Sequence, residues 1–262
     1  MRVFKMLLRI IRKVDNFLFD GDIRNKLRSG REKKWLRRIE EKTDYKLVSY
    51  YQKNNDCLIA SLCDKYGSDK GELRHDGHPY PWSSHSYSDF YSRLFWHCRD
   101  SIRNVFECGI GRKVLRPERL TGISATPGAS LRVWRDFFPS AMIYGADIDT
   151  SVLFEEDRIK TFFVDQLNPT AINACYKAIG IDRFDLIIDD GLHTFEAGST
   201  LFLHSIDRLG ETGIYIIEDV SRADLLRYYD FFRYKDYTVE YVCLHRPSLP
   251  LGDNMLVVIR KR

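Results

Sequence analysis

The sequence predicts an α/β fold in which a doubly wound sheet of seven strands ends in an antiparallel hairpin. Between residues 104 and 234, short apolar runs alternate five times with helical segments, as strands and crossover helices do in a parallel sheet. Several of these runs end abruptly in acidic residues, which indicates strands whose tips open onto a site. Two more strands, within 237–246 and 254–262, follow the last helix and are joined by a short loop.

The composition is that of a globular protein with a packed core. Hydrophobic residues make up 44% of the 262 residues and charged residues 30%, both ordinary values. The net charge is only +4, and much of the basic excess lies before residue 40, so no nucleic-acid partner is expected. The six cysteines form no C-x-x-C pair and no cleavable signal sequence is visible, so we expect reduced thiols and a cytoplasmic location.

Residues 1–65 are predicted to form an N-terminal helical extension. Within it, residues 1–19 place basic and apolar side chains on opposite stripes of a helix. This helix is too interrupted by charge to span a bilayer, which needs roughly 20 mostly apolar residues. Two interpretations stay open: the helix packs on the body or on a second copy in a homo-oligomer, or it makes peripheral contact with an anionic membrane surface.

Residues 66–100 are predicted as a lid loop followed by a helix. The loop contains several glycines and prolines together with many aromatic, histidine and basic side chains. Long loops inside compact domains are usually functional or mobile, so it either packs on itself or covers a small polar ligand. Lys70 and Arg74 offer positive charge to an anionic ligand, whereas His75 and His78 lack the further ligands that a metal pair needs.

The third region, residues 101–262, opens with a strand at 104–108 and a glycine turn at Gly109 and Gly111. Such a turn lets the backbone approach a ligand closely, although an ordinary tight turn is the alternative. No G-x-G-x-x-G pattern is present, which argues against a dinucleotide cofactor. A loop over 112–128 then leads into a helix.

The next two strands, 141–149 and 159–164, also lead into acidic residues. Asp147 lies where an acidic side chain can accept hydrogen bonds from ribose hydroxyls; the alternative is a solvated strand end. Asp165, followed by Gln166, is interpreted either as a partner for the exocyclic amine of a purine or as a cap for the following helix, which is predicted at 169–179.

The most acidic stretches are FDLIIDDGLHTFE, residues 184–196, and GIYIIEDV, residues 213–220. Successive parallel strands bring their carboxyl ends to one edge of the sheet. We therefore expect the carboxylates and the histidine of these stretches to converge on one pocket: Asp190, His193, Glu218 and Asp219. The alternative for His193 is a cap on the next helix, and Asp189 is expected to bond neighbouring backbone.

Clustered carboxylates suit Mg²⁺, which usually keeps water positions that substrate hydroxyls can take. The bound ion lowers the pKa of such a hydroxyl, and His193 can then accept the proton near neutral pH. Without a cation the carboxylates repel one another. The alternative is a site that orients a substrate without metal.

Together these motifs resemble a known family. The succession E-C-G-I-G, G-A-D-I-D, F-V-D-Q, D-D-G-L-H and I-E-D is similar to class I S-adenosylmethionine-dependent methyltransferases, whose Rossmann-like sheet of seven strands ends in such a hairpin. Within that class, KYGSDKG, HSYSDFY and GASLRVWRDFFP resemble the metal-dependent O-methyltransferases that act on macrolide deoxysugars, the mycinamicin and macrocin type. The likeness covers about 66–219, and Lys113 stands where the third glycine of the first motif is usual.

The resemblance implies a cofactor site, a metal site and a base. S-adenosylmethionine is expected to bind along the acidic and glycine-containing tips, with its methionine half first, its ribose next and its adenine last: Glu107, Gly109 and Gly111, then Asp147, then Asp165 and Gln166. Ser130, in the helix after the glycine turn, is assigned to the same site. Mg²⁺ is expected on Asp190, Glu218 and Asp219, with His193 as general base and Asp190 beside it in catalysis.

The sequence thus predicts an enzyme that transfers a methyl group from S-adenosylmethionine to a hydroxyl of a sugar or a similarly polar small molecule. One alternative keeps the fold but replaces the acceptor with a phosphorylated or phosphoramidate intermediate of capsule or lipopolysaccharide decoration. Another is a non-catalytic scaffold with the same fold.

Overall fold

The computed structural model describes residues 56–73, 80, 83–111, 126–244 and 252–262, and a few positions between 30 and 41. The chain divides into two compact units, Met1–Tyr51 and Gln52–Arg262. Helix α3, Leu58–Tyr66, falls in the second unit, although the sequence placed it in the N-terminal extension. The predicted helix at 1–19, most of the loop at 112–128, Arg74 and the pair His75 and His78 lie outside the described residues.

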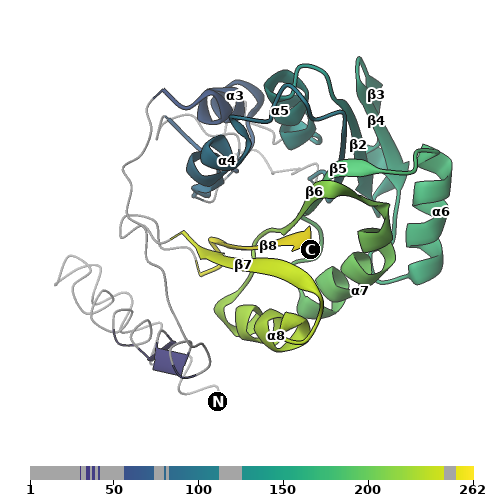
Figure 1. Cartoon of the computed structure of the whole chain (residues 1–262). Helices are drawn as coiled ribbons and strands as arrows, with labels where there is room; N and C mark the ends of the chain where they lie inside the picture. The colour runs from purple at the N-terminus through teal and green to yellow at the C-terminus, as the bar shows by residue number, and fades with distance from the viewer. Residues whose placement is uncertain are drawn as a thin grey trace, which may run out of the picture. The chain divides into compact units, whose positions relative to one another are not determined.

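The second unit is built on one sheet of eight strands in the order β3-β4-β2-β1-β5-β6-β8-β7 (Figure 1). Strands β2, β1, β5 and β6 run parallel, whereas β8 pairs antiparallel with both β6 and β7. The strand bounds are β1 Asn104–Cys108, β2 Met142–Asp147, β3 Glu155–Glu156, β4 Ile159–Phe163, β5 Phe184–Asp189, β6 Leu209–Ile217, β7 Tyr237–Cys243 and β8 Met255–Lys261. This confirms the predicted doubly wound sheet with a terminal hairpin; the extra strand is the two-residue β3.

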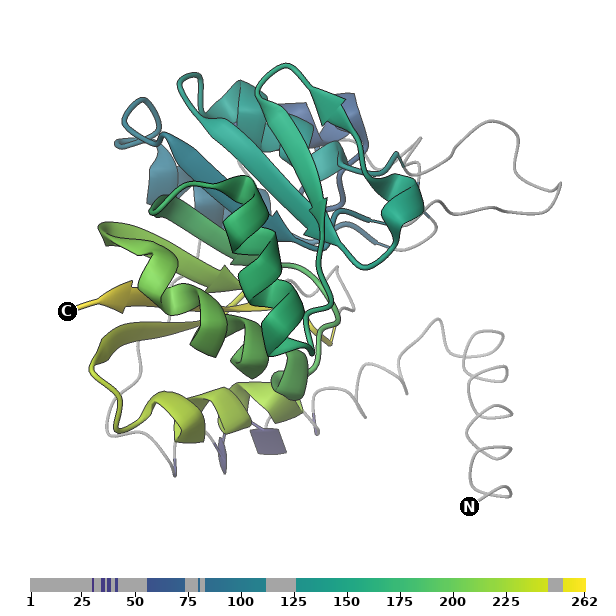
Figure 2. The same ribbon diagram turned by 90° about the vertical axis from the view of Figure 1, so that its right-hand side faces the viewer.

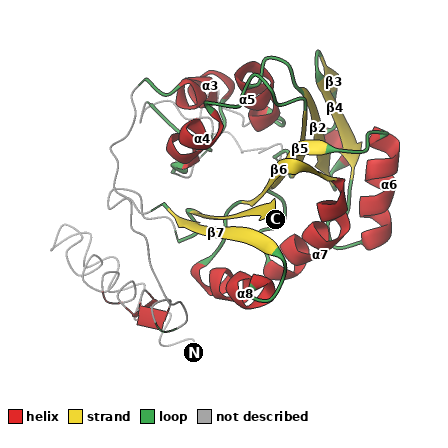
Figure 3. Ribbon diagram, viewed as in Figure 1, coloured by secondary structure: helices red, strands yellow, loops and turns green. Residues whose placement is uncertain are grey.

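Helices cover both faces of the sheet. On one face lie α3, α4 (Tyr87–Phe95) and α5 (Ala129–Phe137); on the other lie α6 (Pro169–Ile179), α7 (Phe195–Ser205) and α8 (Arg222–Phe232) (Figure 3). Figure 2 turns the side that carries α6 and α7 towards the reader. No helix among the described residues has the length and apolar character needed to cross a membrane.

The ends of α6 show how local sequence sets these elements. The side chain of Asn168 accepts hydrogen bonds from the backbone of the first turn, and Pro169 occupies the start of the helix, where its missing N–H costs nothing. Gly180 ends the helix in the left-handed conformation. These signals explain why the predicted and observed bounds of α6 agree.

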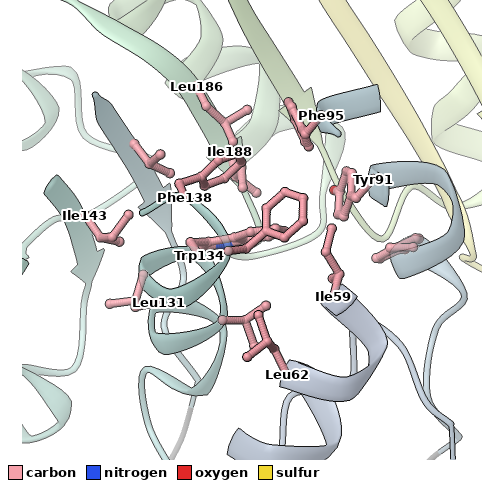
Figure 4. Close-up of a cluster of buried hydrophobic side chains, with 14 of the residues drawn as sticks. Ile59, Leu62, Tyr91, Phe95, Leu131, Trp134, Phe138, Ile143, Leu186 and Ile188 are labelled. Carbon is pink, nitrogen blue, oxygen red and sulfur yellow. The ribbon is translucent and has the colours of Figure 1, made fainter. Parts of the chain in front are cut away.

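The main core lies between the sheet and the layer formed by α3, α4 and α5 (Figure 4). Trp134 of α5 is fully buried there, against Tyr91 of α4 and Phe138. The indole N–H of Trp134 donates a hydrogen bond of 2.7 Å to Oε2 of Glu107, near the end of β1. The core therefore fixes the position of a carboxylate at the carboxyl edge of the sheet.

Candidate active site

The tips of β1, β5 and β6 are tied together by backbone hydrogen bonds. Asp189 is in register with Ile217, so the residues that follow them leave the sheet at the same level. The N–H of Asp190 donates to the carbonyl of Cys108 at 2.8 Å, and the N–H of Glu218 donates to the carbonyl of Asp189 at 2.9 Å. This arrangement places the acidic stretches of the sequence side by side.

The glycine turn after β1 packs directly against the tip of β5. Gly109 has φ 89°, and a Cβ at this position would lie 2.0 Å from the carbonyl oxygen of Asp190. Only glycine fits both the conformation and the space. Gly111 has φ 88°, but a Cβ there would meet no atom of the described residues within 4 Å. Gly109 therefore joins the turn to the acidic tip, whereas no described side chain or backbone crowds Gly111.

Three side chains at these tips converge in a geometry that suits a divalent cation. Asp190, His193 and Asp219 each offer a ligand atom, and these atoms lie within 4.8 Å of one another. Nε2 of His193 is 3.8 Å from Oδ2 of Asp219. The two carboxylates are donors that Mg²⁺ prefers, whereas an imidazole nitrogen suits transition metals better and leaves His193 available as a base beside the ion. The residues present fit the metal that the sequence analysis expected.

The backbone is strained at two of these three residues. His193 has φ 54° and Asp219 has φ 52°, and among the described residues other than glycine only Arg158 shares this conformation. Left-handed backbone at such residues costs roughly 1–3 kcal/mol and is common at functional sites. The strain coincides with the metal-binding geometry.

Glu218 occupies a different place from the three convergent side chains. It is buried, with Oε2 in contact with Nζ of Lys70 and Oε1 accepting a hydrogen bond from the hydroxyl of Tyr91. Each carboxylate oxygen has a second lone pair, so its assignment as a third metal ligand stays a prediction.

The region predicted as a lid contributes side chains that the sequence analysis did not assign to the acidic cluster. Tyr87 donates a hydrogen bond of 2.6 Å to Oδ1 of Asp219, and Nδ1 of His85 lies 2.9 Å from the same oxygen. Nζ of Lys70 lies 2.7 Å from Oδ2 of Asp190 and 3.2 Å from Oε1 of Glu107. The motifs KYGSDKG and HSYSDFY carried the signal, because they contain these residues.

The carboxylates of the cluster have pKa values displaced in opposite directions. Burial raises the pKa of Asp190 to about 7, against the attraction of Lys70. Burial acts in the same sense on Asp219, but the hydrogen bond and charge of His85 lead the contacts that lower its pKa to about 2. Titratable groups with such divergent values are typical of active sites. The site thus combines Asp219, which is ionised at neutral pH, with Asp190, which has too little positive charge nearby to offset its burial.

The chain is similar in sequence to known proteins. No model of a protein family matches the sequence. The chain is 32% identical over 165 residues to the 8-demethyl-8-alpha-L-rhamnosyl tetracenomycin-C 2'-O-methyltransferase of Streptomyces olivaceus, which is 63% of this chain and 38% of that protein. It is 36% identical over 143 residues to the demethylmacrocin O-methyltransferase of Streptomyces fradiae, 54% of this chain and 34% of that protein. The matches thus span little more than a third of these relatives.

The structure of the MycE methyltransferase from the mycinamycin biosynthetic pathway, in complex with Mg and SAH, aligns with 78% of this chain and 54% of its own, with a TM-score of 0.54 and 24% identity. The fold is that of a class I S-adenosylmethionine-dependent methyltransferase. In this methyltransferase fold, the turn at Gly109 and Gly111 and the tips of β2 and β4 are the predicted cofactor edge.

The predicted cofactor residues of the methyltransferase fold differ in how far their polar groups are already engaged. The two oxygens of Asp147 accept hydrogen bonds from the backbone N–H groups of Ile110, at 3.0 Å, and Asp149, at 2.9 Å. Glu107 is fully buried and bound by Trp134 and Lys70. Asp147 therefore stabilises the turn through these two hydrogen bonds, and contacts with Trp134 and Lys70 fix the position of Glu107.

Gln166 uses its amide within the protein. Its Nε2 donates to Oδ1 of Asp189 at 2.6 Å, and its Oε1 accepts from the N–H of Leu192 at 2.9 Å. Asp189 also accepts a hydrogen bond from the N–H of Gly191, in line with its expected backbone role. Gln166 thus braces the loop after β5, and its predicted contact with adenine stays a prediction.

The ends of α6 and α7 show whether Asp165 and His193 cap the helices that follow them. Asn168, not Asp165, caps α6, and Asp165 accepts from the N–H of Leu167 at 3.0 Å. Thr194, not His193, caps α7. Ser130 is buried in the first turn of α5. The capping interpretations of Asp165 and His193 are therefore wrong.

Proposed function

We propose that the protein transfers a methyl group from S-adenosylmethionine to a hydroxyl of a sugar carried by a small molecule, assisted by a divalent metal ion. The observation that carries this proposal is the convergence of Asp190, His193 and Asp219 beside the glycine turn. The names of the relatives support it, because both are O-methyltransferases and one is named for a rhamnosyl-bearing tetracenomycin.

Asp190 and Asp219 would hold the ion, with Glu218 behind them as the third predicted ligand. When bound, Mg²⁺ would supply positive charge that lowers the pKa of an acceptor hydroxyl. Asp219 is suited to this role because its pKa of about 2 keeps it ionised at neutral pH, against its burial, through contacts led by His85. Tyr87 fixes the orientation of the same carboxylate.

His193 would act as the general base. Its side chain is 40% exposed, compared with 23% for Asp190 and 22% for Asp219, so it is the member of the cluster that an acceptor reaches most easily. A base must lie within hydrogen-bond reach of the proton that it removes. His193, with its positive φ, lies in the turn before α7 and not in the helix, which Thr194 caps.

The structure favours a hydroxyl acceptor over an anionic one. The alternative of a phosphorylated or phosphoramidate acceptor depended on the positive charge of Lys70 and Arg74. Lys70 is 2% exposed and its ammonium contacts three carboxylates, so it does not face an incoming phosphate. The excess of carboxylates in the pocket would instead repel such a group.

Binding of the cofactor tests the fold-level part of this proposal. We expect the full chain to bind S-adenosylhomocysteine in a 1:1 complex, measured by isothermal titration calorimetry, and NADH to give no heat under the same conditions. Gly111→Val is a suitable disrupting variant, because a β-branched residue does not tolerate the positive φ of 88° at this position of the turn. Absence of binding to the unmodified chain would favour the non-catalytic scaffold.

Removal of metal tests the catalytic part. Methyl transfer from labelled S-adenosylmethionine is measured by mass spectrometry with a panel of rhamnosylated aglycones and, for comparison, phosphorylated sugars. EDTA should reduce transfer by at least about 100-fold, and added Mg²⁺ should restore it. Transfer that is unchanged in EDTA would remove the metal from the mechanism but leave the cofactor assignment intact.

A further inference from the structure

Lys70 is a buried cation to which the proposed reaction assigns no role. It lies between α3 and α4, yet its side chain is only 2% exposed. Its ammonium is 2.7 Å from Oδ2 of Asp190 and 3.2 Å from Oε1 of Glu107, and it also contacts Oε2 of Glu218. These carboxylates belong to the tips of three different strands, β5, β1 and β6.

The charges around Lys70 do not balance. Its one ammonium faces three carboxylates, those of Glu107, Asp190 and Glu218. The side chains of Lys70, Glu107 and Glu218 are at most 2% exposed, so water does little to screen these charges. One ammonium therefore holds the carboxylates together without neutralising them, and a divalent ion would supply the missing charge.

Backbone hydrogen bonds and close packing hold the segment around Lys70 against the start of α4. The N–H of Ser88 donates to the carbonyl of Lys70 at 2.9 Å, and the N–H of His85 donates to the carbonyl of Asp69 at 2.7 Å. A Cβ on Gly71 would lie 2.2 Å from Oγ of Ser88, so the segment is packed closely against the start of α4. These contacts with the start of α4 hold Lys70 within the acidic cluster.

The position of Lys70 also joins two parts of the site. Glu107 leads into the glycine turn, where the cofactor is expected, and Asp190 belongs to the cluster that fits a metal. The same ammonium contacts both.

We propose that Lys70 is a positioning residue, a built-in counter-ion that keeps Glu107, Asp190 and Glu218 assembled when no divalent ion is bound. The inference rests on the proposed function, since it assumes that a divalent ion binds at Asp190 and Asp219. It follows that a neutral residue at position 70 makes the protein depend on the divalent ion for charge compensation.

Thermal unfolding of Lys70→Met, with EDTA or with saturating Mn²⁺, tests this. We expect the metal-free variant to have a lower Tm than the unmodified chain, and Mn²⁺ to raise its Tm by more than it raises that of the unmodified chain. Loss of a nearby positive charge should also tighten Mn²⁺ binding by at least about ten-fold. A residue with only a packing role would lower Tm equally with and without Mn²⁺.

Two variants serve as controls. Lys65→Met removes a lysine that is 58% exposed on the same segment and should leave the Mn²⁺-induced rise in Tm unchanged. Lys70→Arg keeps the charge and should return that rise towards the value of the unmodified chain. An equal Mn²⁺-induced rise in Lys70→Met and the unmodified chain, or equal Mn²⁺ affinity, would overturn the proposal.

If Lys70→Met does not fold, the double variant Lys70→Met/Glu218→Gln decides, because it removes one positive and one negative charge from the same contact. Recovery of folding in the double variant supports the counter-ion role, and failure to recover overturns it. Neither measurement needs an acceptor or turnover. Failure of the unmodified chain to bind S-adenosylhomocysteine or Mn²⁺ counts instead against the proposed function.

Discussion

Two lysines on one short segment, Lys65 and Lys70, form ion pairs of opposite character. Lys65 is 58% exposed, and its ammonium lies 3.0 Å from Oδ2 of Asp136. Lys70 is 2% exposed and contacts three carboxylates. The first pair links α3 to α5 at the surface; the second lies under the acidic tips of the sheet.

The pKa values of the carboxylates in the two clusters are displaced in opposite directions. The surface cluster consists of Lys65, Tyr66, Arg135 and Asp136, and the buried cluster consists of Lys70, Glu107, Asp190 and Glu218. Burial acts to raise the pKa of Asp136, but hydrogen bonds from Tyr66, Lys65 and Arg135 lower it to about 2. Burial raises the pKa of Asp190 to about 7 in spite of Lys70. The surface cluster has donors in excess and stabilises the fold, whereas the buried cluster has carboxylates in excess. An excess of buried negative charge is costly unless a ligand relieves it, and this marks the second cluster as the functional one.

The largest expected effect is a loss of methyl transfer in His193→Asn, a variant at the acidic tips of the sheet. Asparagine tolerates the positive φ of this position but cannot act as a general base at neutral pH. Transfer should fall by about 10²–10⁴-fold, the usual contribution of general-base catalysis. Single-turnover kinetics with labelled cofactor measures the loss.

Calorimetry with S-adenosylhomocysteine supplies the control for this variant, because its affinity should be unchanged. Asp136→Asn is the matched variant in the surface cluster and should retain full turnover. Normal turnover in His193→Asn would take His193 out of the reaction and weaken the functional distinction between the clusters.

The acidic tips could be predicted from the sequence because they depend on local signals. Apolar runs that end in acid mark the strands, and parallel strands bring their ends to one edge. Asp190, His193 and Asp219 were therefore expected together, and the structure brings them together. The bounds of α6 could be predicted for the same reason, since Asn168, Pro169 and Gly180 are local signals.

The partners of those tips could not be predicted in the same way. Lys70 reaches Asp190 across a gap of 120 positions and Glu218 across 148, and no periodicity in the sequence reports such a contact. The basic residues of the loop predicted contact with an anionic ligand, but the side chain of Lys70 is buried and contacts carboxylates of the protein itself. Gln166 shows the same limit, because its amide is used by Asp189 and Leu192 rather than left for a ligand.

A smaller effect, confined to stability, is expected for Asp136→Asn. The folded-state pKa of Asp136, about 2, lies below the ordinary value of 3.8. A depressed carboxyl pKa contributes stability that is present above the ordinary value and is lost as the pH falls through the folded value. Because the side chain is 25% exposed, solvent screening reduces the contribution to the order of 1–2 kcal/mol.

Urea unfolding at pH 7 and pH 3 measures this contribution. Asp136→Asn should be less stable than the unmodified chain at pH 7, and the difference should shrink at pH 3. Lys65→Met removes one donor of several and should cost less than about 1 kcal/mol at pH 7. A difference that is unchanged by acid would contradict the ion-pair explanation of Asp136. Weaker cofactor binding in Asp136→Asn would show that the surface cluster also supports the site, and that the two lysines do not divide structure from function.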